Sequence, residues 1–351
     1  MTAGGKHGQS PAPLSACDQP LAIRYDVALL DLDGVVYVGP DPVPGAPESL
    51  RKAAEAGLRL GYITNNASRP AEVVAEHLSS FGLDVTGEDV VTSAQAAARL
   101  ISQQYPAGAK VMVVGGEGLF AALDEYGLTA VRSSDEDPVA VVQGFHPEVN
   151  WVLLADGAHA INAGAKWFAT NLDLTIPTAA GKAPGNGALV KAVREAVDVD
   201  PVVAGKPETP LLLTSIERLK AEAPLMVGDR LDTDIAGAYA VGIASLWVAT
   251  GVNDAIDLAA APLEQRPTYI GAGLSALAEK HPAVEVDGGM HSCEGWIAEV
   301  TDGAVVIEGE GEPYDGLRAI LSAAWAANDD AESKDKVDVR AALIKVGLAK
   351  P

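Results

Sequence analysis

The sequence predicts an α/β protein: a doubly wound parallel sheet, a second α/β unit inserted into it, and a small α+β extension at the C-terminal end. From Tyr25 onward, short apolar runs alternate with amphipathic stretches, which is the pattern of parallel strands covered by helices on both faces. The alternation repeats independently between about Ala97 and Asp200, and its character changes after Pro282. A chain of 351 residues has room for two domains and a small third one.

The elements of the first unit are predicted from its apolar runs and from the turn residues between them. Gly57 and Gly82 each stand just past a helical pattern, where a residue with left-handed backbone geometry commonly ends a helix. The predicted strands are Val27–Leu32, Leu58–Thr64, Asp89–Thr92, Pro201–Ala204, Leu225–Val227 and Ser245–Val248. The predicted helices include Pro47–Ala56, Pro70–Phe81 and Glu208–Leu219.

The inserted unit and the C-terminal extension follow from similar patterns. The inserted unit is expected to contain strands near Val111–Val114, Val139–Val142 and Trp167–Ala169. In the extension, the segments 296–300 and 304–307 flank a Gly-containing loop and predict a β-hairpin, followed by helices over 314–327 and 337–346. The expected domains are a disordered tail over residues 1–20, a discontinuous core over 21–96 and 201–281, a cap domain over 97–200, and an accessory module of unassigned role over 282–351.

The charge and the apolar content of the chain restrict its partners. Lys and Arg number 25 against 48 Asp and Glu, so the formal net charge of -23 disfavours binding to nucleic acid or to anionic lipid. The sequence has no apolar run long enough for a membrane span, and residues 1–20 lack the apolar segment of a secretion signal. Cys17 and Cys293 have no spacing typical of a zinc site or a disulfide framework. We therefore expect a cytoplasmic protein with a small-molecule partner, no nucleic acid and no membrane association.

Carboxylates follow two of the predicted strands at the point where each strand ends. Asp31-Leu32-Asp33-Gly34 closes the first strand, Gly228-Asp229 closes the fifth, and Asp232 and Asp234 stand on the opening turn of the next helix. Because parallel strands bring their carboxyl ends to one edge of a sheet, these carboxylates are expected where such sheets bind ligands. Taken alone, a strand that ends in a polar turn would be ordinary, and so would acidic residues in a first helical turn.

Two further segments carry groups suited to an anion. Thr64-Asn65-Asn66 follows the second predicted strand, and a helix opens between Ser68 and Pro70, so hydroxyl, amide and backbone N–H groups face the same edge. Gly205-Lys206-Pro207 follows the run at Pro201–Ala204 and adds one ammonium group. Each of these could be an ordinary helix cap or a solvated lysine. The four motifs together, in this order, make coincidence improbable.

The order Asp-x-Asp, Thr-Asn, Lys and Gly-Asp-x4-Asp resembles the four motifs of the haloacid dehalogenase superfamily, over roughly Leu21 to Lys280. The inserted unit lies between the Thr motif and the Lys motif, as in the subgroup with a large α/β cap of the C2 type. That subgroup includes para-nitrophenyl phosphate, nucleotide, phosphoglycolate, pyridoxal phosphate and glycerol 3-phosphate phosphatases. The resemblance implies Mg²⁺-dependent hydrolysis of a small phosphate monoester, with glycerol 3-phosphate as the favoured substrate, through an aspartyl-phosphate intermediate.

The resemblance also implies a role for the carboxylates. Asp31 would be the nucleophile, and Asp33 would be the general acid and base. Mg²⁺ would be held by the Asp31 carboxylate, the backbone carbonyl of Asp33 and the Asp229 carboxylate, with Asp234 as a supporting ligand.

The same resemblance implies that the anion-binding motifs bind the phosphate group of the substrate. Lys206 and Thr64 would take part in catalysis by stabilising the charge on the phosphoryl oxygens. The expected phosphate-binding groups are Lys206, Thr64, Asn65, Asn66 and the backbone of Gly34.

The cap carries weaker signals. Members of this subgroup often have Asp after the cap's Gly-aromatic pair, whereas this chain has Gly144-Phe145-His146-Pro147-Glu148, and this departure weakens a substrate assignment by resemblance. His146 is expected to be a surface residue of the loop, with contact to substrate as the alternative. Thr170-Asn171-Leu172-Asp173 matches a Thr-Asn-x-Asp pattern of such caps, and Pro184-Gly185-Asn186-Gly187 precedes a helix. Both segments are expected to be structural first and to line the substrate only by analogy.

Other functions stay open at this point. A mutase usually carries a small helical cap between the first two motifs, where this chain has only about 30 residues. A P-type pump is excluded by the lack of membrane spans, and a dehalogenase is disfavoured by Asp33. A catalytically silent binding protein is disfavoured because no catalytic residue is missing. Phosphoglycolate, nucleotide and pyridoxal phosphate remain alternative substrates, and the pattern is compatible with a homodimer.

Overall fold

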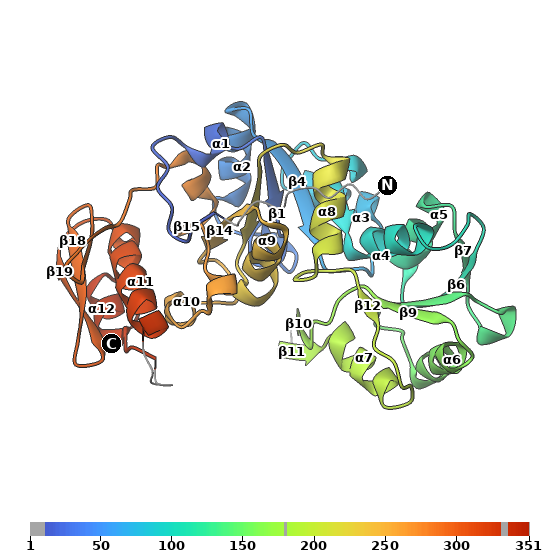
Figure 1. Cartoon of the computed structure of the whole chain (residues 1–351). Helices are drawn as coiled ribbons and strands as arrows, with labels where there is room; N and C mark the ends of the chain where they lie inside the picture. Colours follow the sequence, from blue (N-terminus) through green and yellow to red (C-terminus); the bar gives the residue numbers. More distant parts are fainter. Residues whose placement is uncertain (1–10, 179–180, 331–335, 351) are drawn as a thin grey trace, which may run out of the picture. The chain divides into compact units, whose positions relative to one another are not determined.

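The computed structural model describes residues 11–178, 181–330 and 336–350 of the chain (Figure 1). These residues divide into two compact units, one formed by residues up to 60 and from 221 onward, the other by residues 61–220. The second unit is larger than the insertion expected over 97–200, because segments on both sides of that insertion pack with it. No helix in the described ranges is long and apolar enough to cross a membrane.

The first unit is built around parallel strands in the order β15-β14-β13-β1. Every residue of β1 and β14 is buried, as expected for a sheet that is covered on both faces. The strands are β1 (Val27–Leu30), β13 (Pro224–Gly228), β14 (Ala244–Val248) and β15 (Tyr269–Gly271). The predicted parallel sheet is confirmed here, and β15 adds a strand that the sequence pattern did not predict.

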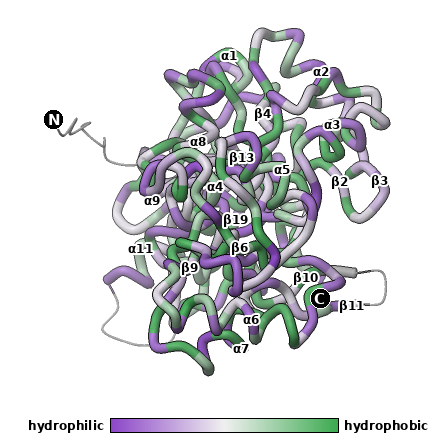
Figure 2. The backbone as a smooth tube through the Cα atoms, turned by 90° about the vertical axis from the view of Figure 1, so that its right-hand side faces the viewer, coloured by the Kyte–Doolittle hydropathy of each residue, from purple (hydrophilic) through white to green (hydrophobic). Residues whose placement is uncertain are grey.

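Helix α2 (Ala46–Glu55) shows how the sequence determines a helix of this unit. Its ion pair, Glu48 with Lys52 at 2.8 Å, lies on the exposed side, where such a pair contributes little. Its orientation therefore depends on the apolar face, whose buried residues are Ala46, Leu50 and Ala53. Figure 2 shows hydrophobic and hydrophilic stretches alternating along the backbone of the chain. The other short elements of the unit are α1 (Leu21–Arg24), β2 (Tyr37–Val38), β3 (Asp41–Pro42), η3 (Leu231–Ile235), α9 (Ala236–Val241), α10 (Ala255–Ala259), η4 (Leu263–Gln265) and η5 (Leu274–Ala278).

The second unit contains a parallel strand pair and a separate parallel sheet. The pair is β4 (Arg59–Thr64) with β5 (Val90–Thr92), and the helices beside it are α3 (Ala71–Ser80), α4 (Ser93–Ser102) and α8 (Thr209–Arg218). The sheet has the order β12-β9-β8-β6-β7. Its strands are β6 (Lys110–Val114), β7 (Thr129–Val131), β8 (Ala140–Gln143), β9 (Lys166–Ala169) and β12 (Val202–Val203). The remaining elements are η1 (Gly87–Asp89), α5 (Glu117–Glu125), η2 (Ser134–Glu136), α6 (Trp151–Asn162), β10 (Thr175–Thr178), β11 (Gly181–Pro184) and α7 (Asn186–Arg194).

One strand prediction is wrong in its assignment. The run Pro201–Ala204 was expected in the core sheet, but its two paired residues form β12, which lies parallel to β9 in the sheet of the inserted unit. A run this short carries no periodicity that could tell which sheet it joins. The Lys206 loop therefore leaves directly from the inserted sheet.

The C-terminal extension belongs to the first compact unit. Its antiparallel sheet has the order β16-β17-β18-β19, and β18 (Trp296–Thr301) pairs with β19 (Ala304–Gly309) as the predicted hairpin (Figure 1). Helix α11 (Pro313–Asp330) packs on β17 (Met290–Cys293) and β18. The other elements are β16 (Glu285–Asp287) and α12 (Arg340–Lys345).

One hydrophobic core joins the extension to the parallel sheet. Trp296 and Trp325 of the extension belong to the same buried cluster as Leu258 of α10 and Ile270 of β15. The indole Nε1 of Trp325 donates to the carbonyl oxygen of Leu258 at 3.0 Å, which fixes α11 against α10. The extension is therefore part of the fold of the first unit and not an appendage to it.

Residues 1–20 were expected to form a disordered tail, but the part of this segment that the structure describes, residues 11–20, is partly ordered. Leu14 and Cys17 are buried, and the backbone of Cys17 exchanges two hydrogen bonds with His281, at 2.7 and 2.8 Å. Residues 1–10 lie outside the described part of the chain. The prediction failed for 11–20 because isolated apolar residues in a Pro-rich segment give no periodic signal.

His281 is held neutral at the junction with the extension. It is 3% exposed, its Nε2 lies 3.1 Å from the carbonyl oxygen of Ala276, and its Nδ1 accepts from the guanidinium of Arg318. Burial, with a smaller effect of the Arg318 charge, lowers the pKa of His281 to about 4. The folded protein therefore binds fewer protons at this residue than the unfolded chain once the pH falls below about 6.5.

We expect this difference to appear as a loss of stability in acid. Between about pH 6.5 and pH 4 the unfolded chain gains a proton that folded His281 does not take, which removes on the order of 3 kcal/mol. Urea unfolding at pH 7, 6 and 5 should show a shallower pH dependence for His281→Gln than for the wild type. Parallel pH profiles for the two proteins would contradict the burial of a neutral histidine.

Candidate active site

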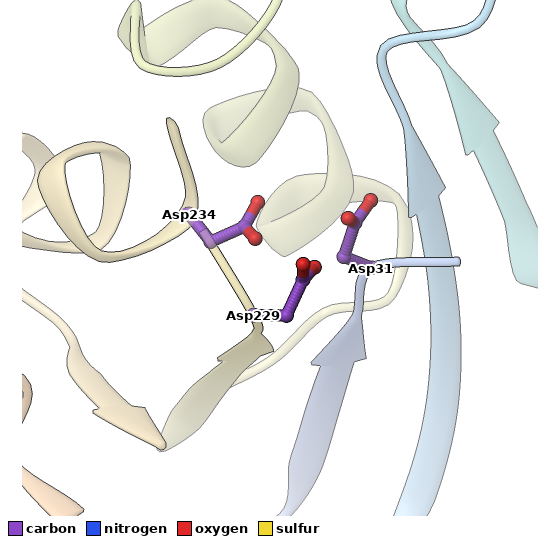
Figure 3. A group of neighbouring side chains, drawn as sticks. All are labelled: Asp31, Asp229 and Asp234. Atoms are coloured by element: carbon purple, nitrogen blue, oxygen red, sulfur yellow. The ribbon is translucent and has the colours of Figure 1, made fainter. Parts of the chain in front are cut away.

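The carboxylates predicted at the strand ends meet in the structure (Figure 3). Asp31 follows β1, Asp229 follows β13 and Asp234 lies in the π-helical turn η3, and one oxygen atom from each lies within 4.8 Å of the others. All three residues are buried, and Asp229 and Asp234 are 0% exposed. The sequence thus correctly predicted that these three side chains would be neighbours.

Backbone groups hold two of these carboxylates in place. Asp229 Oδ2 accepts from the backbone N–H of Val252 at 2.6 Å, and the indole Nε1 of Trp247 donates to the carbonyl oxygen of Asp229 at 3.1 Å. Asp234 Oδ2 accepts from the backbone N–H of Arg230 at 3.1 Å. The charges are therefore oriented by the fold before any ligand binds.

Two glycines leave room for Asp229. A Cβ on Gly251 would lie 2.0 Å from Asp229 Oδ2, and one on Gly34, whose φ is +90°, would lie 2.9 Å from the same atom. Gly34 donates its N–H to Tyr37 O at 2.8 Å and accepts from Thr250 Oγ1 at 2.6 Å. The expectation that the Gly34 backbone donates to phosphate needs correction, because that hydrogen is already used in the turn. Gly34 instead provides space for the carboxylate.

The donor set suits a divalent cation that prefers oxygen ligands. Three buried carboxylates this close together repel one another unless they are protonated or share a cation. Mg²⁺ takes carboxylate and carbonyl oxygens and keeps several waters, so three acidic side chains at one strand edge fit it. Within the described ranges, this is the one group of three or more His, Cys, Asp or Glu residues so arranged. Asp33 lies two residues after Asp31 and is exposed.

The groups expected to bind an anion gather in the second unit. Thr64, at the end of β4, is 3% exposed, and its Oγ1 accepts from the backbone N–H of Asn66 at 3.0 Å, which leaves its own hydrogen to donate. Asn66 is exposed, and its Oδ1 accepts from the backbone N–H and the hydroxyl of Ser68, at 2.9 and 2.7 Å. Lys206 is 3% exposed, which is unusual for a lysine.

Asn65 has a different role from the one predicted. Its side-chain amide accepts from the backbone N–H of Lys206, and it donates to the backbone carbonyl of Lys206 and to the carboxylate of Asp173. The two hydrogens of its Nδ2 are therefore committed within the protein, so the side chain does not donate to a phosphate as was expected.

The cap motif 170–173 is structural, as predicted. Asn171 is buried, and its Nδ2 donates to Asn65 O at 2.7 Å, while Asn186 Nδ2 donates to Asn171 O at 2.8 Å. The sequence reasoning treated these residues separately and missed that they converge on Asn65. It also missed Trp247 and Val252, since neither an indole nor a backbone N–H in a later loop carries a motif signal.

Comparisons with known proteins agree with this arrangement. The family model for haloacid dehalogenase-like hydrolases matches residues 28–129, and a HAD-hydrolase-like model matches residues 203–277. A model for a GCN5-related N-acetyltransferase like domain matches residues 293–348, within the C-terminal extension. The first two matches contain all four motifs between them, while the third lies within the accessory module, to which no role was assigned from the sequence.

Individual relatives lead to the same family. The chain is 45% identical over 316 residues to D-glycerol 3-phosphate phosphatase of Mycobacterium tuberculosis, covering 88% of each chain. It is 39% identical over 238 residues to an acid sugar phosphatase of Staphylococcus aureus, covering 67% of this chain and 90% of the relative. The structure of a glycerol phosphate phosphatase from Mycobacterium tuberculosis in complex with magnesium superimposes with a TM-score of 0.84 at 42% identity, covering 94% of this chain and 100% of that one. The protein belongs to the haloacid dehalogenase-like hydrolase family.

Proposed function

We propose that this protein is a Mg²⁺-dependent phosphatase that hydrolyses glycerol 3-phosphate. The observation that carries the proposal is the buried cluster of Asp31, Asp229 and Asp234 at the strand ends of a chain in this family. The choice of substrate is supported by the 45% identity over 88% of the chain to a relative named for that activity. The relative that covers less of the chain is named acid sugar phosphatase.

In the proposed reaction, Asp31 attacks phosphorus and the ester oxygen leaves. Asp33 donates a proton to that oxygen, so glycerol departs as the neutral alcohol and Asp31 carries the phosphoryl group. Asp33 then takes a proton from a water molecule that attacks the same phosphorus. The Asp31–phosphorus bond breaks, and inorganic phosphate leaves with the Asp31 carboxylate restored.

The chain supplies charge compensation for this step in two ways. Asp31, Asp229, Asp234 and the backbone carbonyl of Asp33 would hold Mg²⁺, which neutralises repulsion between the nucleophile and the phosphate. Lys206 would add a fixed positive charge, and the hydroxyl of Thr64 would donate to a phosphoryl oxygen. A phosphate monoester hydrolyses so slowly in water that the catalyst must supply on the order of 20 kcal/mol, more than any single one of these groups could provide.

The proposal is tested by measuring inorganic phosphate release from a panel of monoesters. The panel contains glycerol 3-phosphate, phosphoglycolate, a nucleoside monophosphate and pyridoxal phosphate, each with and without Mg²⁺. We expect the highest kcat/KM for glycerol 3-phosphate, complete loss with EDTA and recovery when Mg²⁺ is restored. No release from any substrate, by a folded protein that binds Mg²⁺, would favour the catalytically silent binding protein.

The proposed setting is the cytoplasm. Support comes from Cys17 and Cys293, which are both free and buried and so form no disulfide between them. The homodimer expected for this type of cap stays a prediction.

A further inference from the structure

We propose that Asn65 is a positioning residue, whose side chain clamps the backbone of Lys206 and couples it to Asp173 of the inserted unit. The inference rests on the proposed function, in which the Lys206 ammonium contacts the transferred phosphoryl group. Asn65 itself touches none of the reacting atoms. It acts by fixing where the Lys206 side chain begins.

Three hydrogen bonds define the clamp. Asn65 Oδ1 accepts from the backbone N–H of Lys206 at 2.8 Å, and Asn65 Nδ2 donates to the backbone carbonyl of Lys206 at 3.0 Å. The same Nδ2 donates to Asp173 Oδ2 at 3.0 Å. A side-chain amide has one carbonyl oxygen and two N–H hydrogens, so every strong group of Asn65 is engaged.

Asparagine is the residue type that this position requires. An amide presents an acceptor and a donor side by side, which matches the N–H and C=O of a single residue on a neighbouring backbone. Aspartate would keep the acceptor but lose both donors, and it would place a second carboxylate beside Asp173. The space is also closed, because a Cβ on Gly205 would lie 2.5 Å from Asn65 Oδ1 and 2.4 Å from Thr170 O.

The backbone of Asn65 is anchored as firmly as its side chain. Its carbonyl oxygen accepts from Ser93 Oγ at 2.6 Å and from Asn171 Nδ2 at 2.7 Å. The loop that follows β9 therefore contributes Asn171 to the main chain of Asn65 and Asp173 to its side chain. A displacement of this loop reaches the backbone of Lys206 through one residue.

Burial makes the clamp matter for the lysine. Lys206 is 3% exposed, so few alternative rotamers of its side chain fit the space, and the side chain cannot compensate for a shift of its backbone. A displacement of a catalytic group by about 1 Å can lower the rate about 100-fold. Loss of the clamp is therefore expected to lower kcat more than it raises KM.

The test uses three variants of the full chain. Asn65→Asp removes both donors, and we expect kcat to fall about 100-fold. Asp173→Asn is the single-substitution reference for the exchange variant, because its amide oxygen can still accept from Asn65. In the exchange variant Asn65→Asp/Asp173→Asn, the new amide donates to the new carboxylate, and kcat should recover at least about tenfold relative to Asn65→Asp.

A matched control and a second readout keep the result interpretable. Asn162→Asp replaces an exposed asparagine whose Nδ2 donates to Ala196 O at 3.0 Å, and it should leave kcat unchanged. The dissociation constant for inorganic phosphate, measured by calorimetry in saturating Mg²⁺, should rise in Asn65→Asp and recover in the exchange variant. Thermal unfolding midpoints show whether a variant is merely less stable.

The outcomes separate this inference from the proposed function. If the wild type hydrolyses monoesters and Asn65→Asp does so equally well, the clamp has no role and the inference is wrong. A reduced kcat without any recovery in the exchange variant would overturn the coupling to Asp173, because the exchange restores only the hydrogen bond between positions 65 and 173. If the wild type hydrolyses no monoester, the proposed function fails, and the dissociation constants for inorganic phosphate then test the clamp by themselves. A weaker affinity in Asn65→Asp that recovers in the exchange variant supports the clamp. Equal affinities in all variants refute it.

Discussion

Asp31→Asn should reduce phosphate release by about 10⁴-fold or more, to the limit of detection. The amide that replaces the carboxylate is a poor nucleophile, and it also removes one of the three negative charges that would hold Mg²⁺. The substitution preserves the size and shape of the side chain, so the buried strand end should still pack. The measurement is a steady-state assay with glycerol 3-phosphate at saturating Mg²⁺.

The matched control for this variant is Asp41→Asn, which makes the same chemical change at an exposed position on β3. It should keep full activity. Trapping with fluoride complexes of beryllium, which mimic an aspartyl-phosphate, adds a structural readout that should succeed in the control and fail in Asp31→Asn. Retention of more than a small fraction of activity by Asp31→Asn would exclude the covalent mechanism.

Trp325→Ala should lower the free energy of unfolding by about 3 to 5 kcal/mol. The indole is 5% exposed, it belongs to the core shared with the parallel sheet, and its Nε1 donates to Leu258 O at 3.0 Å. The guanidinium of Arg266 also lies over its ring, 5.1 Å from the centroid. Removing it leaves a cavity and an unpaired carbonyl where α11 meets α10.

The same variant shows whether the extension is separable from the catalytic unit. For Trp325→Ala we expect a single unfolding transition in which activity and tertiary structure are lost together. A chain that ends at Pro282 should fail to fold stably. Trp151→Ala removes the same side chain from a site that is 79% exposed, and its unfolding free energy should change little. A shortened chain with unchanged turnover and unchanged unfolding would show that residues 283–351 are an independent module.

The positions of the clustered carboxylates could be predicted from sequence because they depend on a general property of parallel sheets. Asp31 and Asp229 end buried apolar runs, and strands in such a sheet place their carboxyl ends together whatever lies between them in sequence. The order of the four motifs then indicated phosphate ester hydrolysis, through their resemblance to the haloacid dehalogenase superfamily. Sequence periodicity also sufficed for helices such as α2, whose apolar face repeats at regular spacing.

The partners of Asn65 could not be predicted in the same way. Its hydrogen bonds reach Asp173 and Lys206, which are 108 and 141 residues further along the chain. Nothing local distinguishes an asparagine that donates to a ligand from one that donates to a backbone carbonyl. The amide of Gly34 presents the same difficulty, since its acceptor is set by a turn rather than by a motif.

The division of the chain into its two units has a consequence for synthesis on the ribosome. Residues 61–220 are continuous, so that unit can complete its fold once they have left the exit tunnel. In the unit that holds the three aspartates, β1 pairs with β13, which follows the whole of residues 61–220 in the chain. The apolar residues of β1 therefore lack this partner strand until residues 61–220 have been made.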